Sequence, residues 1–437
     1  MSVIRTIQMT DADADRQLAE LRAPTGLDAL VLTDRPETRA VREVIAAVRN
    51  RGDDALIELT ERFDHVTLRA DEIRVSPDEI EAARQQTAPA VLAAIRTAID
   101  GLRRFQASLL TRTPPALEQD GVALQGRYRP LRRAGACVPG AAAPLPSSAI
   151  HCIVPAQVAG VAETVIVAPP RYARSIHPTT LAVAAELGVT DVYRIGGAQA
   201  VAALALGTQT VRRVDKIVGP GSVYVQLAKR LLYGVVGIDM FAGPSEVVVI
   251  ADDSANPAWV ATDLLAQAEH DPGCAMLVTA DEAFARTVEA ELAKQLPTLS
   301  TAEGARRSLE TLSAVLIVAD LDHAVALTNE IAPEHLHVQT RDAAAVADRI
   351  DSAGAIFVGP YSPESSGDYV AGPSHVLPTG GGARFFSGLC CNDFLRRTSM
   401  ITYSHEAIRK AAPVIATLAR AEGLDAHARS ATTRTDE

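Results

Sequence analysis

The sequence predicts an α/β protein with two Rossmann-like parallel-sheet domains and small helical segments at its N- and C-terminal ends. From about residue 160 onward, short β-branched runs alternate with apolar helical stretches. Strand–helix–strand units of this kind form parallel sheets that are covered by helices on both faces. At 437 residues, of which 48% are hydrophobic, the chain is long enough to bury more than one core. No G-x-G-x-x-G motif opens any of the helices, so the usual dinucleotide fingerprint is lacking.

The first 130 residues are predicted to be mostly helical. Residues 32–64 have apolar side chains at helical spacing and charged side chains on the opposite face. The next helical stretch starts after Ser76, whose hydroxyl group can cap a helix, and Glu79 follows three residues later in a capping-box pattern. We therefore expect this region to consist of amphipathic helices.

The alternation of strands and helices continues to about residue 360. The predicted strands lie in the segments ETVIVAPP, DVYRIGG, DKIVGPG, SEVVVIADD, CAMLVTADE, AVLIVADLD and GAIFVGPYSPE. The last fifty residues differ. There a glycine-rich loop (residues 378–388) precedes a helix that begins near Ser404, and the polar end SATTRTDE is expected to fray.

The charge and composition exclude several classes of protein. The net charge is −11 and no basic block stands out, which argues against binding to nucleic acid or to a membrane surface. No apolar run is long enough to span a bilayer, and the first residues contain no apolar core of a signal peptide. The five cysteines include no CxxC pair, which indicates a reducing compartment. A cytoplasmic enzyme is the expectation.

Three glycine-rich turns are candidates for binding phosphate groups. They are VPGAAAPLPSS (138–148), IGGAQA (195–200) and VGPGS (218–222), and each lies next to a predicted strand and helix. Open α/β sheets bind ligands at such turns, where free N–H groups of a helix suit an anion. Turns of this kind also arise for steric reasons alone, so none of them identifies a nucleotide site by itself.

The polar residues of the second half suggest acid/base and metal chemistry. Glu334 and His335 are adjacent after Pro333, which ends the preceding helix. A solvated surface pair is the alternative interpretation. Gln267 and His270 lie three residues apart, so both project from one face at the end of a helix. His270 could instead serve only as a partner for the helix dipole.

Four more candidates follow along the chain. Asp368 and His375 lie in a long predicted loop, and Glu422 and His427 lie near the C-terminus. Long loops inside compact domains are usually functional. Two histidines, an aspartate and an amide oxygen together make a plausible donor set for a borderline divalent ion such as zinc.

The chain resembles the histidinol dehydrogenase family over nearly its full length. The resemblance is carried, in order, by CVPGAAAPLPSS, GGAQAVAALALGT, VDKIVGPGSVYVQLAKR, IDMFAGPSEVVVIAD, ATDLLAQAEHDP, NEIAPEHL, GPYSPESSGDYVAGPSHVLPTGGGARFFSGL and AEGLDAH. It implies an oxidoreductase that converts L-histidinol to L-histidine through L-histidinaldehyde in two NAD-dependent steps, the last step of histidine biosynthesis. It also implies one zinc ion per subunit and a homodimer whose active site is shared between the subunits.

The resemblance implies a role for each candidate residue. The acid/base pair would be Glu334, which activates a water for the aldehyde step, and His335, which removes protons in both steps. The zinc ligands would be Gln267, His270, Asp368 and His427. The substrate contacts would be Ser245, His375 and Glu422, together with His335 and the zinc ligands. The residues near NAD would be Cys137, Gln199 and Ser222.

The chain departs from the family pattern at three positions. It has Cys137 where the family usually has tyrosine, Ser222 where asparagine is usual, and Ala141 in place of the second glycine of a PGG motif. By the resemblance, Cys137 and Ser222 border the nucleotide, and all three changes leave the zinc and acid/base residues intact. A related dehydrogenase of another small alcohol therefore stays open as an alternative, and a zinc hydrolase that uses Glu334 as its base is a further one.

The resemblance also implies how the chain is divided into domains and what each domain binds. Residues 1–30 form an N-terminal segment. Residues 31–136 and 245–390 form a larger catalytic domain that holds zinc. Residues 137–244 form a second domain on the NAD side, and residues 391–437 form a C-terminal segment that crosses to the partner subunit.

Overall fold

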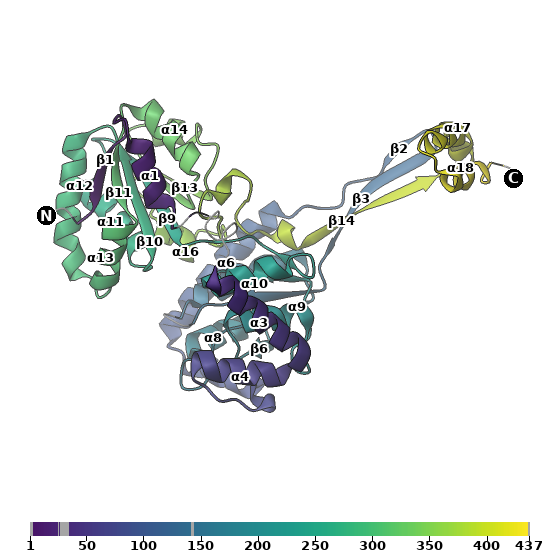
Figure 1. Ribbon diagram of the computed structural model, residues 1–437, viewed down its shortest axis with the longest axis horizontal. Coiled ribbons are helices and arrows are strands. Elements are labelled where there is room, and N and C mark those ends of the chain that lie inside the picture. The colour runs from purple at the N-terminus through teal and green to yellow at the C-terminus, as the bar shows by residue number, and fades with distance from the viewer. Residues whose placement is uncertain (1–2, 25, 27–34, 141–143, 436–437) are drawn as a thin grey trace.

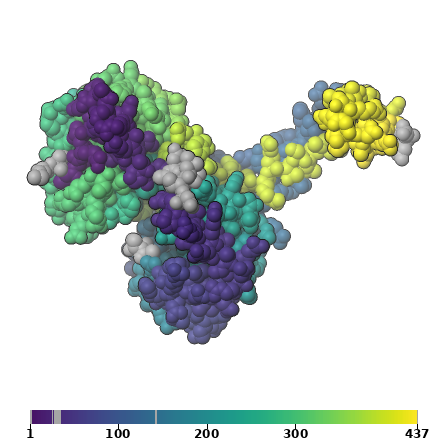
Figure 2. All heavy atoms as spheres, viewed as in Figure 1, coloured from purple at the N-terminus to yellow at the C-terminus, as the bar shows by residue number. Residues whose placement is uncertain are grey.

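The computed structural model describes residues 3–24, 26, 35–140 and 144–435. Two α/β lobes, each with its own parallel sheet, lie next to each other, and a long arm projects from them (Figure 1). The space-filling view shows that the tip of the arm stands well away from both lobes (Figure 2). The expected pair of parallel-sheet domains is therefore confirmed. Among the described residues, no helix has the length and apolar character needed to cross a membrane.

One lobe is built on a six-stranded sheet in the order β1-β11-β10-β9-β12-β13, and all neighbouring strands are parallel. The strands are β1 (Arg5–Gln8), β9 (Ser245–Ala251), β10 (Gly273–Thr279), β11 (Ala314–Ile317), β12 (His335–Gln339) and β13 (Ala355–Val358). The central strands read as continuous apolar runs because helices cover both faces. One face packs against α11 (Pro257–Ala268), α12 (Glu282–Gln295) and α13 (Ala302–Thr311). The other packs against α1 (Ala14–Arg22), α14 (Leu321–Ile331) and α15 (Ala343–Ala347).

The second lobe is built on a five-stranded sheet in the order β6-β5-β4-β7-β8, again parallel throughout. Its strands are β4 (Arg133–Cys137), β5 (Glu163–Val167), β6 (Asp191–Tyr193), β7 (Lys216–Val218) and β8 (Gly237–Ile238). One face packs against α5 (Pro77–Gln86), α6 (Pro89–Leu109), α7 (Pro146–Ala159) and α8 (Pro178–Glu186). The other packs against α3 (Pro36–Arg51), α4 (Asp53–Asp64), α9 (Gly197–Leu206) and α10 (Val223–Leu232).

The position of the N-terminal helices corrects the expected domain division. Residues 31–136 were assigned to the larger domain, but α3 to α6 pack on the five-stranded sheet, and β4 is one of its strands. Val41 and Leu56 share a core with Val165 and Ile195 of this lobe. The physical reason is that amphipathic helices pack wherever an apolar sheet face is free, and helical periodicity does not say which sheet that is. The predicted cap at the start of α5 is confirmed, since Ser76 Oγ accepts a hydrogen bond from the Glu79 N–H at 3.2 Å.

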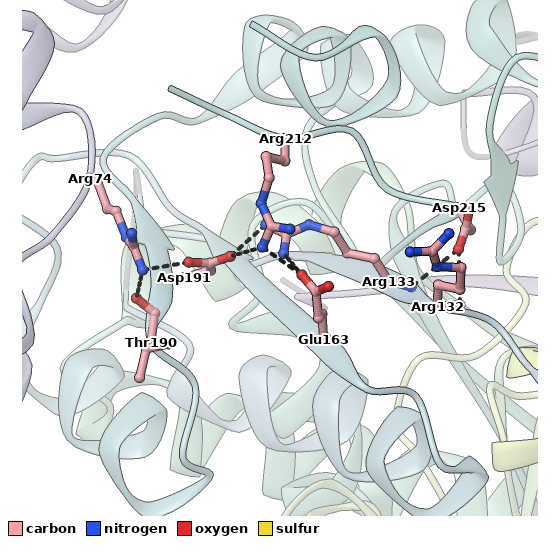
Figure 3. Close-up of polar contacts among 8 residues, drawn as sticks. All are labelled: Arg74, Arg132, Arg133, Glu163, Thr190, Asp191, Arg212 and Asp215. Atoms are coloured by element: carbon pink, nitrogen blue, oxygen red, sulfur yellow. Dashed lines mark hydrogen bonds and ion pairs between the residues drawn. The ribbon is translucent and has the colours of Figure 1, made fainter. Parts of the chain in front are cut away.

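An ion-pair network joins the amino ends of the strands in the five-stranded sheet (Figure 3). Arg133, at the start of β4, is buried and contacts Glu163 at 2.5 Å and Asp191 at 2.6 Å. Arg212 reaches the same two carboxylates from the loop after α9. Arg74, from the helical N-terminal region, pairs with Asp191 at 2.6 Å and so ties that region to this sheet.

The arm was not predicted as a sheet. It consists of the antiparallel strands β2 (Leu117–Gln119), β3 (Val122–Pro130) and β14 (Leu395–Tyr403), with α17 (His405–Ala421) and α18 (Asp425–Thr432) at its tip. Neither β3 nor β14 contains a fully buried residue, so the ribbon lacks the apolar alternation that marks a strand with a buried face. The polar end expected to fray is also partly wrong, because α18 extends to Thr432.

Candidate functional site

Glu334 and His335 lie at the amino edge of the six-stranded sheet. Helix α14 ends at Ile331, Ala332 adopts a left-handed conformation (φ 51°), and β12 starts at His335. Ser245 is the first residue of the neighbouring strand β9, which pairs with β12 two residues further on. Because parallel strands start at the same edge, these side chains are brought together there. Open sheets usually bind ligands at the opposite, carboxyl edge.

The Glu334 side chain is almost completely buried, with 5% of its surface exposed. Its Oε2 atom accepts a hydrogen bond from the backbone N–H of Glu246 at 3.0 Å. Burial raises the pKa of the Glu334 carboxyl group well above its ordinary value, and the nearby carboxylates of Glu364, Glu246 and Asp368 act in the same direction. The alternative of a solvated surface pair is therefore wrong for Glu334.

The His335 imidazole is buried to the same degree, with 4% of its surface exposed. Its Nδ1 atom lies 3.5 Å from Glu364 Oε1 and 3.9 Å from Glu334 Oε2, and neither ring nitrogen makes a hydrogen bond. Burial lowers the pKa of His335 to about 3, and the neighbouring histidines His337 and His270 add to this. His335 is therefore neutral at physiological pH, and one of its ring nitrogens has a lone pair that can accept a proton.

Gln267, His270 and Asp368 gather beside this pair. Gln267 and His270 come from the last turn of α11 and the residues that follow it, and Gln267 Nε2 lies 3.4 Å from His270 Nδ1. Gln267 is fully buried, yet its Oε1 atom has no hydrogen-bond partner. Burial raises the pKa of Asp368 to about 6, while His270 and His337 oppose the increase. Asp368 lies on the short helix α16 (Glu364–Tyr369), so the expectation of a loop at this residue is wrong.

His375 does lie in a loop, and it faces the same region. Its Nδ1 atom is 3.8 Å from Asp368 Oδ1. Its ring stacks on that of His151, from α7 in the other lobe, with centroids 4.0 Å apart. A cavity of about 550 Å³ is lined by His335, Asp368 and His375, together with Phe357 and Cys390. A small polar substrate fits a space of this volume and lining.

Glu422 and His427 lie far from this cluster within one chain. They are exposed residues at the tip of the arm, at the end of α17 and on α18 (Figure 1). Among the residues that the structure describes, no group of three or more His, Cys, Asp or Glu side chains is arranged to hold a metal ion. Gln267 offers an amide oxygen, and the fourth predicted ligand, His427, is on the arm.

Gln199 and Ser222 lie at the carboxyl edge of the five-stranded sheet. Both line a cavity of about 530 Å³ whose other walls come from α3, α4 and Pro169. Gly197 has a positive φ of 64°, and a Cβ atom there would lie 2.9 Å from Gln199 Oε1, so glycine leaves room for the amide. Cys137 ends β4, but its buried thiol is not among the residues that line this cavity, and burial raises its pKa to about 12. Ala141 lies outside the described residues.

Comparison with known proteins identifies the relatives of the chain. A model of the family described as histidinol dehydrogenase matches residues 32–435. The histidinol dehydrogenase of Heliobacterium mobile is 46% identical over 436 residues, which cover 100% of both chains. That of Brucella melitensis is 43% identical over 433 residues, 99% of each chain. The crystal structure of histidinol dehydrogenase from Elizabethkingia anophelis superposes with a TM-score of 0.91 at 34% identity and covers 99% of this chain and 98% of the other.

The chain belongs to the histidinol dehydrogenase family. The resemblance drawn from its sequence motifs is thereby confirmed, and so is its assignment as an oxidoreductase. The matched length leaves no large part of the chain outside the histidinol dehydrogenase pattern.

The motifs of the histidinol dehydrogenase family did not point to four polar residues of this site. Glu364 and His337 are buried beside His335, and His337 Nδ1 lies 3.2 Å from Asp263 Oδ2. His151 stacks on His375. Two signals were available in the sequence: His337 follows His335 by two residues on one strand, and Glu364 precedes Asp368 by four residues on one helix.

Proposed function

We propose that the protein oxidises L-histidinol to L-histidine in two NAD-dependent steps at a zinc site, through an L-histidinaldehyde that stays bound. The observation that carries this proposal is the buried pair Glu334 and His335, which lies beside Gln267, His270 and Asp368. A histidinol dehydrogenase needs these two bases, and membership of the family supplies the substrate. The product makes the reaction the last step of histidine biosynthesis.

The residues at the amino edge of the six-stranded sheet fit a zinc ion. Gln267 Oε1 is buried without a partner, as expected of an atom that binds a group other than protein. An imidazole of His270 and a carboxylate of Asp368 complete three nitrogen and oxygen donors of the kind that zinc takes. His427 of a second copy is the fourth donor in this proposal.

The carboxyl edge of the five-stranded sheet is the side that we assign to NAD. Gln199 and Ser222 line a cavity there, next to the start of α9 and α10, whose free N–H groups suit a pyrophosphate. When bound, NAD accepts the hydride in each step, while zinc holds and polarises the substrate.

His335 carries out the proton abstraction in both steps. Its neutral imidazole accepts the hydroxyl proton of the alcohol as hydride leaves, and later the hydroxyl proton of the hydrated aldehyde. Burial of the His335 imidazole excludes water and lowers its pKa, so the ring is unprotonated before the substrate binds. His375 lines the cavity with His335 and orients the substrate. In this proposal Ser245, at the start of β9, and Glu422 of the second copy also contact the substrate, Glu422 at the imidazole or ammonium group.

Glu334 prepares the second step. Once ionised, a carboxylate with a raised pKa is a stronger base than a surface carboxylate, which suits removal of a proton from water that adds to the aldehyde. Glu334 and His335 are consecutive at the start of a strand, so their side chains serve different positions on the substrate.

The arm supports a homodimer with a shared site. Leu117, Ile401, Val414 and Leu418 are each more than 60% exposed on it, although they are large apolar residues. Apolar surface of this kind marks a protein–protein interface, and a second copy gives a closed two-fold assembly. The same pairing supplies His427 and Glu422 to the partner's cluster.

The test is absorbance at 340 nm with purified, zinc-loaded protein, NAD and L-histidinol. About two NADH should form for each L-histidinol consumed, with no free aldehyde, because one site holds both bases. A yield of one NADH, with aldehyde trapped by semicarbazide, would contradict the two-step reaction. NADH formation from another small alcohol but not from L-histidinol would indicate a related dehydrogenase.

A further inference from the structure

The proposed reaction releases protons into a buried site. Oxidation of one alcohol to a carboxylate with two NAD⁺ and one water yields two NADH and three protons. In the proposed reaction, His335 receives such protons while the substrate occupies the cavity that His335 lines, and only 4% of the His335 surface is exposed. A route for protons through the protein would let the base return to its neutral form before the second step.

A row of four titratable side chains leads away from the cavity. His335 Nδ1 lies 3.5 Å from Glu364 Oε1, and Glu364 Oε2 lies 3.9 Å from His337 Nε2. His337 Nδ1 in turn lies 3.2 Å from Asp263 Oδ2. Each intermediate residue therefore meets its inner neighbour with one polar atom and its outer neighbour with the other.

Three members of this row, His335, Glu364 and His337, are buried, and several of their facing atoms have no hydrogen-bond partner. Both ring nitrogens of His335, His337 Nε2 and Glu364 Oε2 have no hydrogen-bond partner, although their side chains are at most 5% exposed. Burying a polar atom without a hydrogen-bond partner destabilises the fold, so these groups serve a purpose other than stability. Phe357 packs near both imidazole rings, at 6.1 and 5.1 Å between centroids, and helps to keep water out.

Asp263 forms the outer end of the row. Its side chain is 14% exposed, whereas those of His337 and Glu364 are 1% and 4% exposed. Its Oδ2 atom also accepts a hydrogen bond from Gln339 Nε2 at 2.6 Å, which holds the carboxylate toward His337. The row thus runs from the catalytic base to a carboxylate that touches solvent.

We propose that Glu364, His337 and Asp263 conduct protons from His335 to solvent, an inference that rests on the proposed dehydrogenase function. His335 accepts the substrate proton at Nε2 and gives its Nδ1 proton to Glu364. Glu364 passes a proton to His337 Nε2, and His337 passes its Nδ1 proton to Asp263, which releases it to water. One proton enters and one leaves, and reorientation of the rings and carboxyl group restores the starting tautomers.

The surrounding charges are compatible with this transfer. Besides the two histidines of β12, Glu364 is near Asp368 on its own helix and Asp263 on α11, and both carboxylates favour its protonated form. His335 is also near Glu334, His270 and His375. The separations exceed ideal hydrogen bonds, but catalytic contacts of this kind often tighten only when the substrate is bound.

The test is stopped-flow measurement of NADH and of proton release, by a pH indicator in weak buffer, on zinc-loaded dimers. In the wild type, proton release should keep pace with NADH. In Glu364→Gln, His337→Gln and Asp263→Asn, proton release should lag behind NADH by at least about tenfold. Concentrated imidazole buffer hides the indicator signal, so its effect is read from NADH: it should restore the wild-type rate of the second NADH in Asp263→Asn, whose defect is at the surface. Asp263→Glu should show no lag in weak buffer. His323→Gln, in the first turn of α14 and outside the row, is the matched control and should behave as the wild type.

Equal rates of proton and NADH appearance in the folded Asp263→Asn and His337→Gln variants would overturn the route. A slow second NADH in Asp263→Asn that imidazole buffer does not restore, together with a lag in Asp263→Glu, would also overturn the route, because that is the signature of a structural defect. A wild type that forms no NADH from L-histidinol would instead contradict the proposed function itself.

Discussion

The two lobes each contain a group of buried charged and titratable side chains, and the two groups differ in how they are paired. In the five-stranded lobe, both terminal amino groups of Arg133 contact carboxylates, and Arg74 and Arg212 reinforce them. In the six-stranded lobe, Glu334, His335, His337 and Glu364 lie within a few ångströms, and several of their atoms have no partner.

This difference distinguishes polar side chains that stabilise the fold from polar side chains that serve a ligand or a reaction. A paired arginine network satisfies its charges and fixes the strands that carry it, whereas unpartnered buried groups weaken the fold unless a ligand or a reaction uses them. The pKa shifts follow the same division. Arginine partners lower the pKa of Glu163, while burial raises that of Glu334 and Glu364. Mutations in the two groups should therefore affect different properties.

The largest effect is expected from the acid/base pair. His335→Asn should lower kcat for both oxidation steps by about 10²–10⁴-fold, because it removes the proposed proton acceptor. Glu334→Gln should slow oxidation of added L-histidinaldehyde more than that of L-histidinol. Steady-state rates with each substrate, monitored at 340 nm, check both expectations.

Thermal unfolding of the same variants provides the control. Neither variant should unfold at a lower temperature than the wild type. The ring nitrogens of His335 have no hydrogen-bond partner to lose, and the amide oxygen of Glu334→Gln can still accept the hydrogen bond from the Glu246 N–H. Equal effects of the two mutations on both steps would contradict the division of labour between Glu334 and His335.

The next effect concerns the arm, which lies outside both lobes. A variant lacking Glu334 and His335 and a variant lacking His427 should each be inactive alone. If they are co-expressed in equal amounts, random pairing makes about half of the dimers heterodimers, and one of the two sites in each is intact when His427 acts in the partner. Activity should then recover to about a quarter of that of the wild type.

Native mass spectrometry should confirm the heterodimers in that mixture. Background activity in their presence would show that His427 serves its own chain, since every site would then carry one defect. The position of His427 at the tip of the arm, away from Gln267 and Asp368, is the reason to expect recovery.

A stability effect is expected from the arginine network. Arg133→Met should lower the free energy of unfolding by about 3 kcal/mol, because Asp191 and Glu163 lose their buried partner. Arg212→Met is the matched control: its side chain is 66% exposed, so a change within about 0.5 kcal/mol is expected. Urea titration measures both, and kcat of folded Arg133→Met should equal that of the wild type.

The sequence predicted the lobes well because their central strands are buried on both faces. Runs such as VVVIA in β9 and CAMLV in β10 are apolar throughout, and the local pattern is sufficient to identify them. The arm strands β3 and β14 carry no such pattern, and the choice of sheet for α3 to α6 depends on long-range packing that periodicity does not encode.

The candidate site was predictable only in part for the same reason. Glu334, His335, Gln267, His270 and Asp368 sit in recognisable motifs, and the structure brings them together. The contribution of Glu364, His337 and Asp263 depends on distances between a helix, a strand and another helix. No local sequence signal reports such distances. The spacing of two residues between His335 and His337, and of four between Glu364 and Asp368, shows only that each pair can lie on one face of its element.

The smallest expected effect concerns how the stability of the fold changes with pH, which should have opposite signs in the two groups. Burial pushes the pKa of Asp191 upward, but Arg133, Arg74 and Arg212 more than offset this, so it falls below the ordinary value of 3.8. A carboxylate with a lowered pKa contributes stability above its unfolded pKa, and the contribution is lost as the pH falls through the folded value. Asp191→Asn should therefore be destabilised relative to the wild type at pH 7, and the gap should close below about pH 4.

Glu364 should show the opposite trend. Its pKa is raised by burial first and then by Asp368 and Asp263, so its contribution is present below the unfolded pKa and is lost as the pH rises. Glu364→Gln, which stays neutral, should gain stability relative to the wild type between about pH 5 and pH 8. Urea titrations of chelator-treated protein across this range measure both slopes. If the stability difference from the wild type changed with pH in the same direction for both variants, Glu364 would be paired with a cation as Asp191 is. The contrast between the two lobes would then be wrong.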